Sequence, residues 1–132
     1  MSKEMLKFVN IEKETPFKKK VTTRKEDFKE IANLCYQHNY QLNTHAIGDR
    51  GNSYVLDHYS KFLKPNNDKR WRIEHAQMVS DNDLLRFKEF NIVPSMQPSH
   101  CTSDMRWMDA RIGTHRFHRI SRWKTFTELG LP

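Results

Sequence analysis

Two histidines, His45 and His75, are the residues of this chain whose type and spacing point most directly to chemistry. Each ends a short run that is typical of a β-strand, and the segment between them is typical of a helix. Such spacing fits one β/α unit, so adjacent parallel strands would each carry an imidazole at the carboxyl end, where ligands gather in α/β barrels. Imidazole is the commonest metal ligand among side chains, and the pair therefore predicts a metal site. The alternative is that two of seven histidines fall at strand ends by chance.

Other polar residues are candidates for weaker roles. Gln97 and His100 follow the third predicted strand, in the loop where barrel active sites collect substrate contacts. They are predicted to bind substrate, and hydrogen bonding to the loop backbone is an equal alternative. Asp49 and Asp104 are predicted first as helix N-caps, because short carboxylates accept hydrogen bonds from orphan amides at a helix start.

Three strands alternate with helices along the chain. Residues 1–22 are predicted to form a lead-in strand or loop, and residues 23–132 are predicted to form a segment of a (β/α) barrel. Apolar periodicity and turn residues predict strands at 41–46, 71–76 and 91–97, and helices near 23–38, 50–63, from Ser80 onward, 104–111 and 122–129. This alternation indicates an α/β fold with a parallel sheet and right-handed crossovers.

Side-chain alternation in the second strand makes a further prediction. If His75 points into the barrel mouth, Ile73 lies on the same face, and Arg72 and Glu74 face the helix layer. A charged pair on that side is costly unless the two groups bond to each other. Glu74 is therefore predicted to be a salt-bridge partner, with a catalytic carboxylate as the alternative.

Composition excludes several classes of function. The chain has 132 residues and a formal net charge of +7, yet no glycine-rich phosphate loop, zinc finger or aromatic-basic motif accompanies that charge. We therefore expect a solvated basic surface and no nucleic-acid partner. The two cysteines do not make a disulfide framework, and reduced thiols fit a cytoplasmic protein. No apolar run approaches the length of a membrane span, so no membrane association is expected.

Three motifs follow one another along the chain: HAIGDRGN at 45–52, RIEHAQ at 72–77 and QPSHCTSDM at 97–105. Together they resemble signature stretches of amidohydrolase family 3, which holds metal-dependent hydrolases similar to N-substituted formamide deformylase. The resemblance runs from about residue 23 to the C-terminus. It implies a partial TIM (β/α)8 barrel of about three β/α units, because a whole barrel needs roughly 250 residues.

The resemblance also implies a ligand set. Members of the superfamily hold one or two divalent metals, usually zinc, through a His-x-His pair on the first strand, a carbamate or carboxylate on the fourth, single histidines on the fifth and sixth, and an aspartate on the eighth. His45 and His75 match the fifth- and sixth-strand positions. The implied reaction in the complete enzyme is hydrolysis of a non-peptide C–N bond in a small amide or formamide substrate.

The chain departs from that pattern, since it has no His-x-His and no strand-eight aspartate. A catalytic zinc normally has three protein ligands, so no residue is predicted to be catalytic, and zinc binding by the chain alone should be weak or absent. One hypothesis is a fragment that acts only within a complete barrel. The other is a non-enzymatic remnant, or an interaction module that uses open barrel edges. Either leads us to expect a complementary barrel half or self-association.

Overall fold

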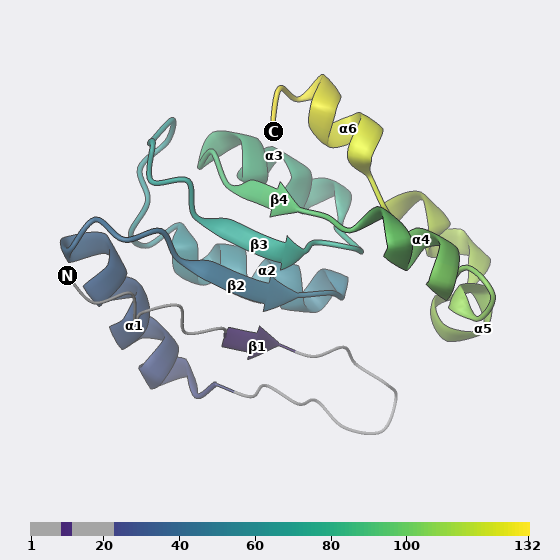
Figure 1. Cartoon of the computed structure of the whole chain (residues 1–132), viewed down its shortest axis with the longest axis horizontal. Helices are drawn as coiled ribbons and strands as arrows, with labels where there is room; N and C mark the ends of the chain where they lie inside the picture. The colour runs from purple at the N-terminus through teal and green to yellow at the C-terminus, as the bar shows by residue number, and fades with distance from the viewer. Residues whose placement is uncertain (1–8, 12–22) are drawn as a thin grey trace.

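A computed structural model describes residues 9–11 and 23–132 of the chain. Its centre is a four-stranded parallel sheet in the order β1-β2-β3-β4 (Figure 1). The strands are β1 (Val9–Ile11), β2 (Asn43–Ala46), β3 (Arg72–His75) and β4 (Val93–Ser95). The predicted α/β class and partial barrel are confirmed, because three parallel strands alternate with helices as expected. β1 lies in the predicted lead-in, and the rest of 1–22 lies outside the described residues.

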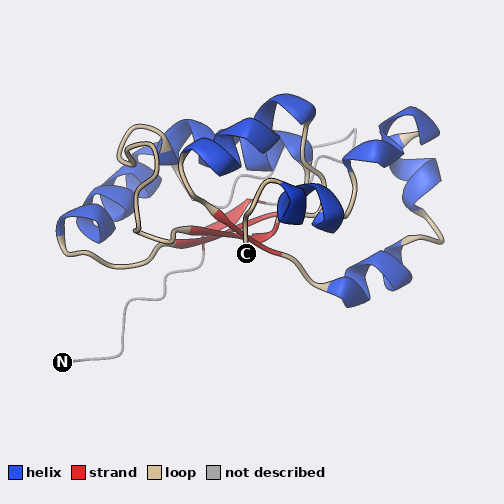
Figure 2. Ribbon diagram, turned by 90° about the horizontal axis from the view of Figure 1, so that it is seen from above, coloured by secondary structure: helices blue, strands red, loops and turns tan. Residues whose placement is uncertain are grey.

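Helices cover one side of the sheet, as the view in Figure 2 shows. They are α1 (Lys25–Gln37), α2 (Asp49–Tyr59) and α3 (Asp81–Glu89). Their apolar faces form one buried cluster with the sheet, in which Phe28, Tyr59 and Phe87 are fully buried. The Tyr59 hydroxyl bonds to Thr44 Oγ1 at 2.7 Å, so a polar contact also fastens α2 to β2.

The helix starts correct two predicted caps, whereas the helix expected from Ser80 onward begins where it was predicted. Ser80 caps α3, because its hydroxyl accepts the Asp83 amide. Asp49 is not a cap: the cap position of α2 is Gly48, and the Asp49 carboxylate lies 3.4 Å from the guanidinium of Arg119 instead. Asp104 is not a cap either, since it ends a helix rather than starting one. The Asp104 carboxylate accepts from Gln77 Nε2 at 2.7 Å, so at both aspartates a long-range partner takes the place of local capping.

The segment after β4 folds differently from the prediction. It forms α4 (Pro98–Asp104), α5 (Met108–Ile112), the 3-10 helix η1 (Thr114–Arg119) and α6 (Trp123–Glu128). The single helix predicted at 104–111 is therefore wrong, and His100 lies in a helix rather than a loop. The reason is Pro98, which is preorganised for the first helical turn and starts α4 directly after β4. The predicted last helix is confirmed as α6, whose Phe126 packs on Phe87 with ring centroids 5.0 Å apart.

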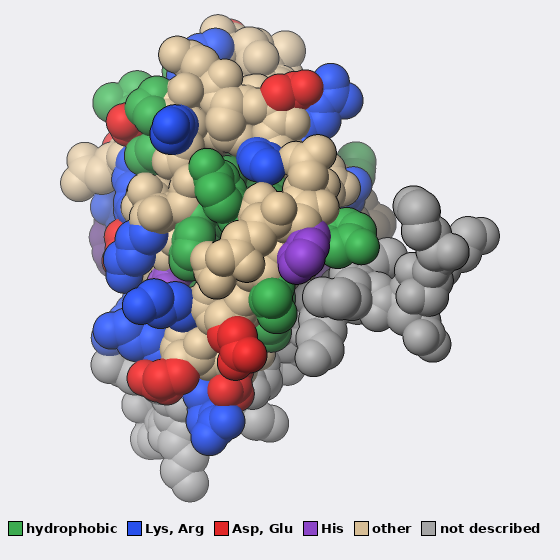
Figure 3. Space-filling model, turned by 90° about the vertical axis from the view of Figure 1, so that its left-hand side faces the viewer, with side chains coloured by type: hydrophobic (Ala, Val, Ile, Leu, Met, Phe, Trp, Pro, Cys, Tyr) green, Lys and Arg blue, Asp and Glu red, His purple; other side chains and the backbone are tan. Residues whose placement is uncertain are grey.

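Charge is distributed without a single dominant patch on the face shown in Figure 3. Lys and Arg side chains lie there in separate groups, with acidic and uncharged side chains between them. None of the helices in the described part of the chain is both long and apolar enough to cross a membrane. Of the two free cysteines, Cys35 is a buried residue of α1 and Cys101 is a half-buried residue of α4.

Candidate metal site at the carboxyl ends of the strands

The structure brings His45 and His75 together. The two residues end adjacent parallel strands, whose carboxyl ends point towards α4 and α5 (Figure 1). Their ring centroids are 4.4 Å apart and the rings are nearly perpendicular. Both side chains are partly buried. The two imidazoles thus share one small region at the carboxyl ends of the strands, where ligands of α/β barrels bind.

The side chains of Ile73 and Glu74 in β3 lie on the faces of the sheet opposite to those predicted. Ile73 is fully buried and pairs in register with Thr44, which bonds to Tyr59 of α2, so both residues face the helices. Glu74 is the register partner of His45, and both lie on the opposite, open face. The expected alternation would then send His75 to the helix side. The backbone of His75 prevents this, because its φ of 74° is left-handed and breaks the alternation.

The open face of the sheet carries a charged pair beside the histidines. A guanidinium nitrogen of Arg72 lies 2.7 Å from a carboxylate oxygen of Glu74, and also donates to Ser95 Oγ at 2.7 Å. The expected salt bridge of Glu74 is present, although on the face opposite to the predicted one. A half-buried pair on that side is tolerable because each charge has a partner.

Gln97 and His100 both contact His75. Oε1 of Gln97 lies 2.6 Å from Nδ1 of His75, and Nε2 of Gln97 donates to the Ser95 carbonyl at 3.0 Å. The His100 ring stacks on the His75 ring with centroids 5.0 Å apart. The structure therefore shows Gln97 bonded to a backbone carbonyl and to a candidate ligand. The substrate-binding role of Gln97 and His100 stays a prediction.

Burial lowers the pKa of His75, while the hydrogen bond that the ring donates to Gln97 Oε1 acts in the opposite direction. Desolvation disfavours the charged imidazolium more than the neutral ring. A neutral imidazole is also the form that binds metals. The environment of His75 therefore favours the protonation state that a metal ligand needs.

Asn52 is a site residue that the sequence reasoning missed. It is fully buried, and its Nδ2 donates to the carbonyls of Gly48 at 2.9 Å and Met78 at 3.1 Å. Weaker contacts reach the carbonyls of Ala46 and Ile47. Asn52 thus ties the loop after β2 to the loop after β3. A signal was available, because Asn52 occupies a position of the apolar stripe that continues through residues 55, 56 and 59 of α2.

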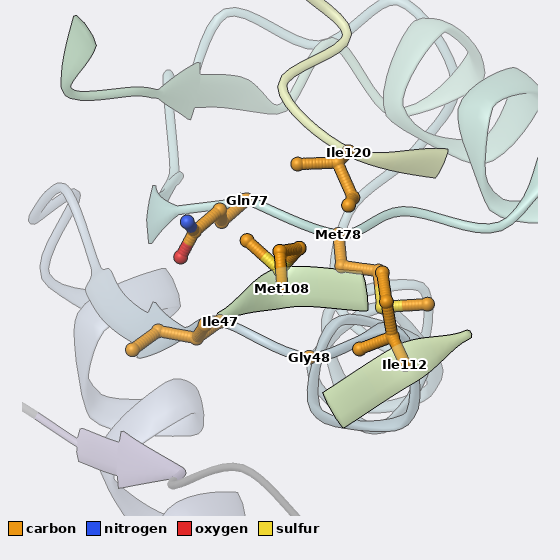
Figure 4. Close-up of a pocket in the computed structure, with 7 residues that line it drawn as sticks. All are labelled: Ile47, Gly48, Gln77, Met78, Met108, Ile112 and Ile120. Carbon is orange, nitrogen blue, oxygen red and sulfur yellow. The ribbon is translucent and has the colours of Figure 1, made fainter. Parts of the chain in front are cut away.

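A small apolar hollow lies beyond the histidines, between the loops after β2 and β3 and helix α5 (Figure 4). Its wall is mostly aliphatic, and it is lined by Ile47, Gly48, Gln77, Met78, Met108, Ile112 and Ile120. Three of these residues, Met78, Met108 and Ile112, form a second small buried cluster. At its rim, Nε2 of Gln77 donates to the Asp104 carboxylate at 2.7 Å. This cluster fixes α5 to the loops that carry the site.

The residues present fit part of a metal site. The two imidazoles supply nitrogen ligands of the type that zinc and other divalent metals accept. Within residues 9–11 and 23–132, no group of three or more His, Cys, Asp or Glu side chains is arranged to hold a metal. A catalytic zinc normally has three protein ligands. The described chain therefore fits two ligand positions of such a site and leaves the others to be supplied from elsewhere.

This combination of a parallel α/β barrel segment and paired strand-end histidines is typical of metal-dependent hydrolases. A profile of the amidohydrolase family matches residues 8–132. The chain belongs to this family, and the resemblance to amidohydrolase family 3 is confirmed.

Relatives of the chain are much longer proteins. The chain is 38% identical over 78 residues to Protein LONG AFTER FAR-RED 3 of Arabidopsis thaliana, covering 58% of this chain and 13% of that protein. It is 34% identical over 92 residues to the putative amidohydrolase YtcJ of Bacillus subtilis, covering 69% of this chain and 17% of that protein. The chain thus spans less than a fifth of the length of these curated relatives.

Two crystal structures are similar to the fold. One is an uncharacterized metal-dependent hydrolase from Pyrococcus furiosus, with a TM-score of 0.74 and 26% identity over 94% of this chain and 25% of that chain. The other, an uncharacterized metal-dependent hydrolase from Pyrococcus horikoshii OT3, has the same TM-score and identity over 92% of this chain and 24% of that chain. The chain therefore spans about a quarter of the length of each of these two proteins.

Proposed function

We propose that this chain is the part of a metal-dependent amidohydrolase that supplies two histidine ligands, His45 and His75, to a divalent metal. In the complete barrel the reaction would be hydrolysis of a non-peptide C–N bond in a small amide or formamide. The observation that carries the proposal is the 4.4 Å separation of the two imidazoles at the carboxyl ends of adjacent parallel strands. Family membership supports the reaction class.

The roles of the residues follow from their positions. His45 and His75 would hold the metal through imidazole nitrogens, and zinc is the metal we propose. A divalent metal in such a site lowers the pKa of a bound water and polarises a carbonyl oxygen. Glu74 and Arg72 neutralise each other on the open face, so they add no net charge next to the ligands. The other ligands and the proton-transferring carboxylate would come from other strands of the barrel.

Metal titration of the chain tests the ligand assignment. Cobalt(II) is a suitable probe, because its absorption bands report imidazole ligation directly. We expect weak binding that is lost in His45→Ala and in His75→Ala, since a two-ligand site cannot spare either ring. His38→Ala is the matched control, because His38 is exposed at the end of α1, away from the strand ends. Binding that survives both site variants would contradict the assignment.

Activity measurements test the second part of the proposal. We expect no zinc-dependent amide hydrolysis by the 132-residue chain alone, because the described residues supply only two ligands. Turnover should require the remaining strands of the barrel, added as a separate segment or joined in one polypeptide. Robust hydrolysis by the chain alone that a chelator abolishes would overturn this expectation.

We also infer that the outer edge of β4 pairs with another strand in the complete protein. Among the described strands β4 pairs only with β3, and a closed barrel leaves no such edge. Val93 and Met96 at this edge are half-buried, and Ile92 beside them is fully buried. The preferred neighbour is a complementary barrel segment, and a second copy of the chain is the substitute when that segment is missing.

Sedimentation of the chain at micromolar concentrations tests the edge. We expect self-association, which Val93→Lys should weaken because a lysine on an edge strand opposes pairing. Leu85→Lys is the control, because Leu85 is an exposed apolar residue on α3, away from the edge. A stable monomer with a cooperative thermal transition and no dye-binding apolar surface would refute the inference.

A further inference from the structure

The side-chain amide of Gln97 bridges two groups of the site. Its Oε1 lies 2.6 Å from Nδ1 of His75, and its Nε2 donates to the backbone carbonyl of Ser95 at 3.0 Å. Gln97 stands at the start of α4, directly after β4. Both ends of the amide are therefore engaged within the chain, and one of them is engaged with a candidate metal ligand.

These two contacts determine which nitrogen of His75 carries the proton. A carbonyl oxygen only accepts hydrogen bonds, so the end of the amide that faces Ser95 must be the NH2 group. The other end, facing His75, is then the amide oxygen. Because that oxygen also only accepts, the neutral ring must carry its proton on Nδ1. Nε2 is left with its lone pair.

The backbone and a second ring support the same orientation. His75 has a φ of 74° and Ala76 a φ of 40°, so two successive residues without a glycine's freedom adopt left-handed conformations. Such strain persists only where the surrounding structure fixes it, and it is frequent at functional sites. The His100 ring stacks on the His75 ring at 5.0 Å and limits its rotation. Gln97 then supplies the directional contact that the stacking lacks.

We propose that Gln97 is a positioning residue, which fixes the Nδ1–H tautomer and the ring orientation of His75 so that Nε2 is the atom presented to a metal. This inference rests on the proposed function for its metal, whereas the tautomer can be measured without one. It also differs from the substrate contact expected of Gln97, because the amide is already committed at both ends. Partners of this kind to ligating histidines affect metal affinity in many proteins.

Long-range proton–nitrogen correlation spectra of the metal-free chain test the tautomer. At a pH well above the ordinary imidazole range, the spectrum of the wild-type chain should show His75 protonated on Nδ1. In Gln97→Leu, which keeps the bulk and removes the acceptor, the proton should move to Nε2, the tautomer that an unconstrained neutral histidine favours. Gln97→Glu keeps an acceptor and should retain the Nδ1–H form. Gln41→Leu is the matched control, because Gln41 also bonds to a backbone carbonyl but at the other end of β2.

Cobalt(II) titration gives the second measurement. Gln97→Leu should weaken binding by about 10- to 100-fold, and Gln97→Glu should bind within a few-fold of the wild-type chain. An Nε2–H tautomer in the wild-type chain would overturn the inference by itself, even if Gln97→Leu failed to fold. An unchanged tautomer in folded Gln97→Leu would overturn it as well. If the wild-type chain has the Nδ1–H form but its cobalt binding survives His75→Ala, the ligand assignment fails while the positioning of the ring stands.

Discussion

Replacement of Asn52 is the sharpest test of how the site is held together. Asn52→Ala removes the amide that donates to Gly48 and Met78, and with it the polar tie between the loops after β2 and β3. The Gly48 carbonyl keeps a partner, because it also accepts the backbone amide of residue 52. The Met78 carbonyl loses the partner described for it. The variant therefore leaves one buried acceptor unsatisfied and a small cavity.

The loss of unfolding free energy in Asn52→Ala can be worked out from these contacts. An unsatisfied buried carbonyl costs about 1–3 kcal/mol. The loss is partly offset, because Oδ1 of Asn52 is itself buried without a partner among the described residues and disappears with the amide. We expect a decrease of about 2 kcal/mol in the free energy of unfolding. With a urea m-value of about 2 kcal/mol per M, the unfolding midpoint should fall by about 1 M.

Asn52→Asp sharpens the test, because it keeps the shape and replaces the donor by an acceptor. A carboxylate oxygen would then face carbonyl oxygens, so this variant should lose more stability than Asn52→Ala. Asn82→Ala is the control, since Asn82 is exposed on α3 and its loss should change stability by less than about 0.5 kcal/mol. If Asn52→Asp were as stable as wild type in urea melts, the account of Asn52 as the donor between the two loops would be wrong.

Three more perturbations report on the packing around the site. Tyr59→Phe should lose about 1–2 kcal/mol of unfolding free energy in urea melts, because it leaves the buried Thr44 hydroxyl without its partner; a second change, Thr44→Val, should add little on that background. Asp83→Ala should lose about 2–3 kcal/mol, since this buried carboxylate accepts from Ser53 of α2 and from Arg86 of α3; a thermal midpoint equal to that of wild type would contradict this. The guanidinium of Arg122 lowers the pKa of Asp81 below its ordinary value of 3.8, so this contact stabilises the fold above that pH and the benefit disappears as the pH falls through the lowered value. The stability difference between wild type and Asp81→Asn should accordingly vanish in acid, and a constant difference across that range would exclude the contact as its source.

The order of strands and helices along the chain was predictable, because it depends on residue types and their spacing. The alternation of strand and helix, and the meeting of His45 and His75 at one edge, follow from the regular length of β/α units. The facing of β3 did not follow. Alternation of side chains between the two faces of a strand holds for an extended backbone, whereas the φ of 74° at His75 is left-handed. A positive φ at histidine leaves no mark in sequence, so Ile73 and Glu74 were assigned to the wrong faces.

Polar contacts between residues distant in sequence were also not predicted. Asp49 has the composition of a cap, but its partner Arg119 lies 70 positions further along the chain. The contact between the Gln97 amide and His75, 22 positions away, was not predicted, and the predicted role of Gln97 in substrate binding stays a prediction. Such contacts depend on where separate loops meet. Local sequence patterns do not encode those meetings, although the polar Asn52 within an apolar stripe gave a readable sign of one.

The order of the strands in the sheet bears on how the chain folds during its synthesis. Spatial order equals chain order, and paired residues such as Thr44 and Ile73, or Ile73 and Pro94, lie 29 and 21 positions apart. Each strand therefore finds its neighbour as soon as the next β/α unit has left the ribosome, and no pairing has to wait for a distant segment. Domains fold from the N-terminal side during synthesis, so the order of pairing matches the order in which the strands emerge. A sheet paired unit by unit in this way can be divided between units with the pairings inside each part preserved, and the division leaves one unpaired strand edge on each part.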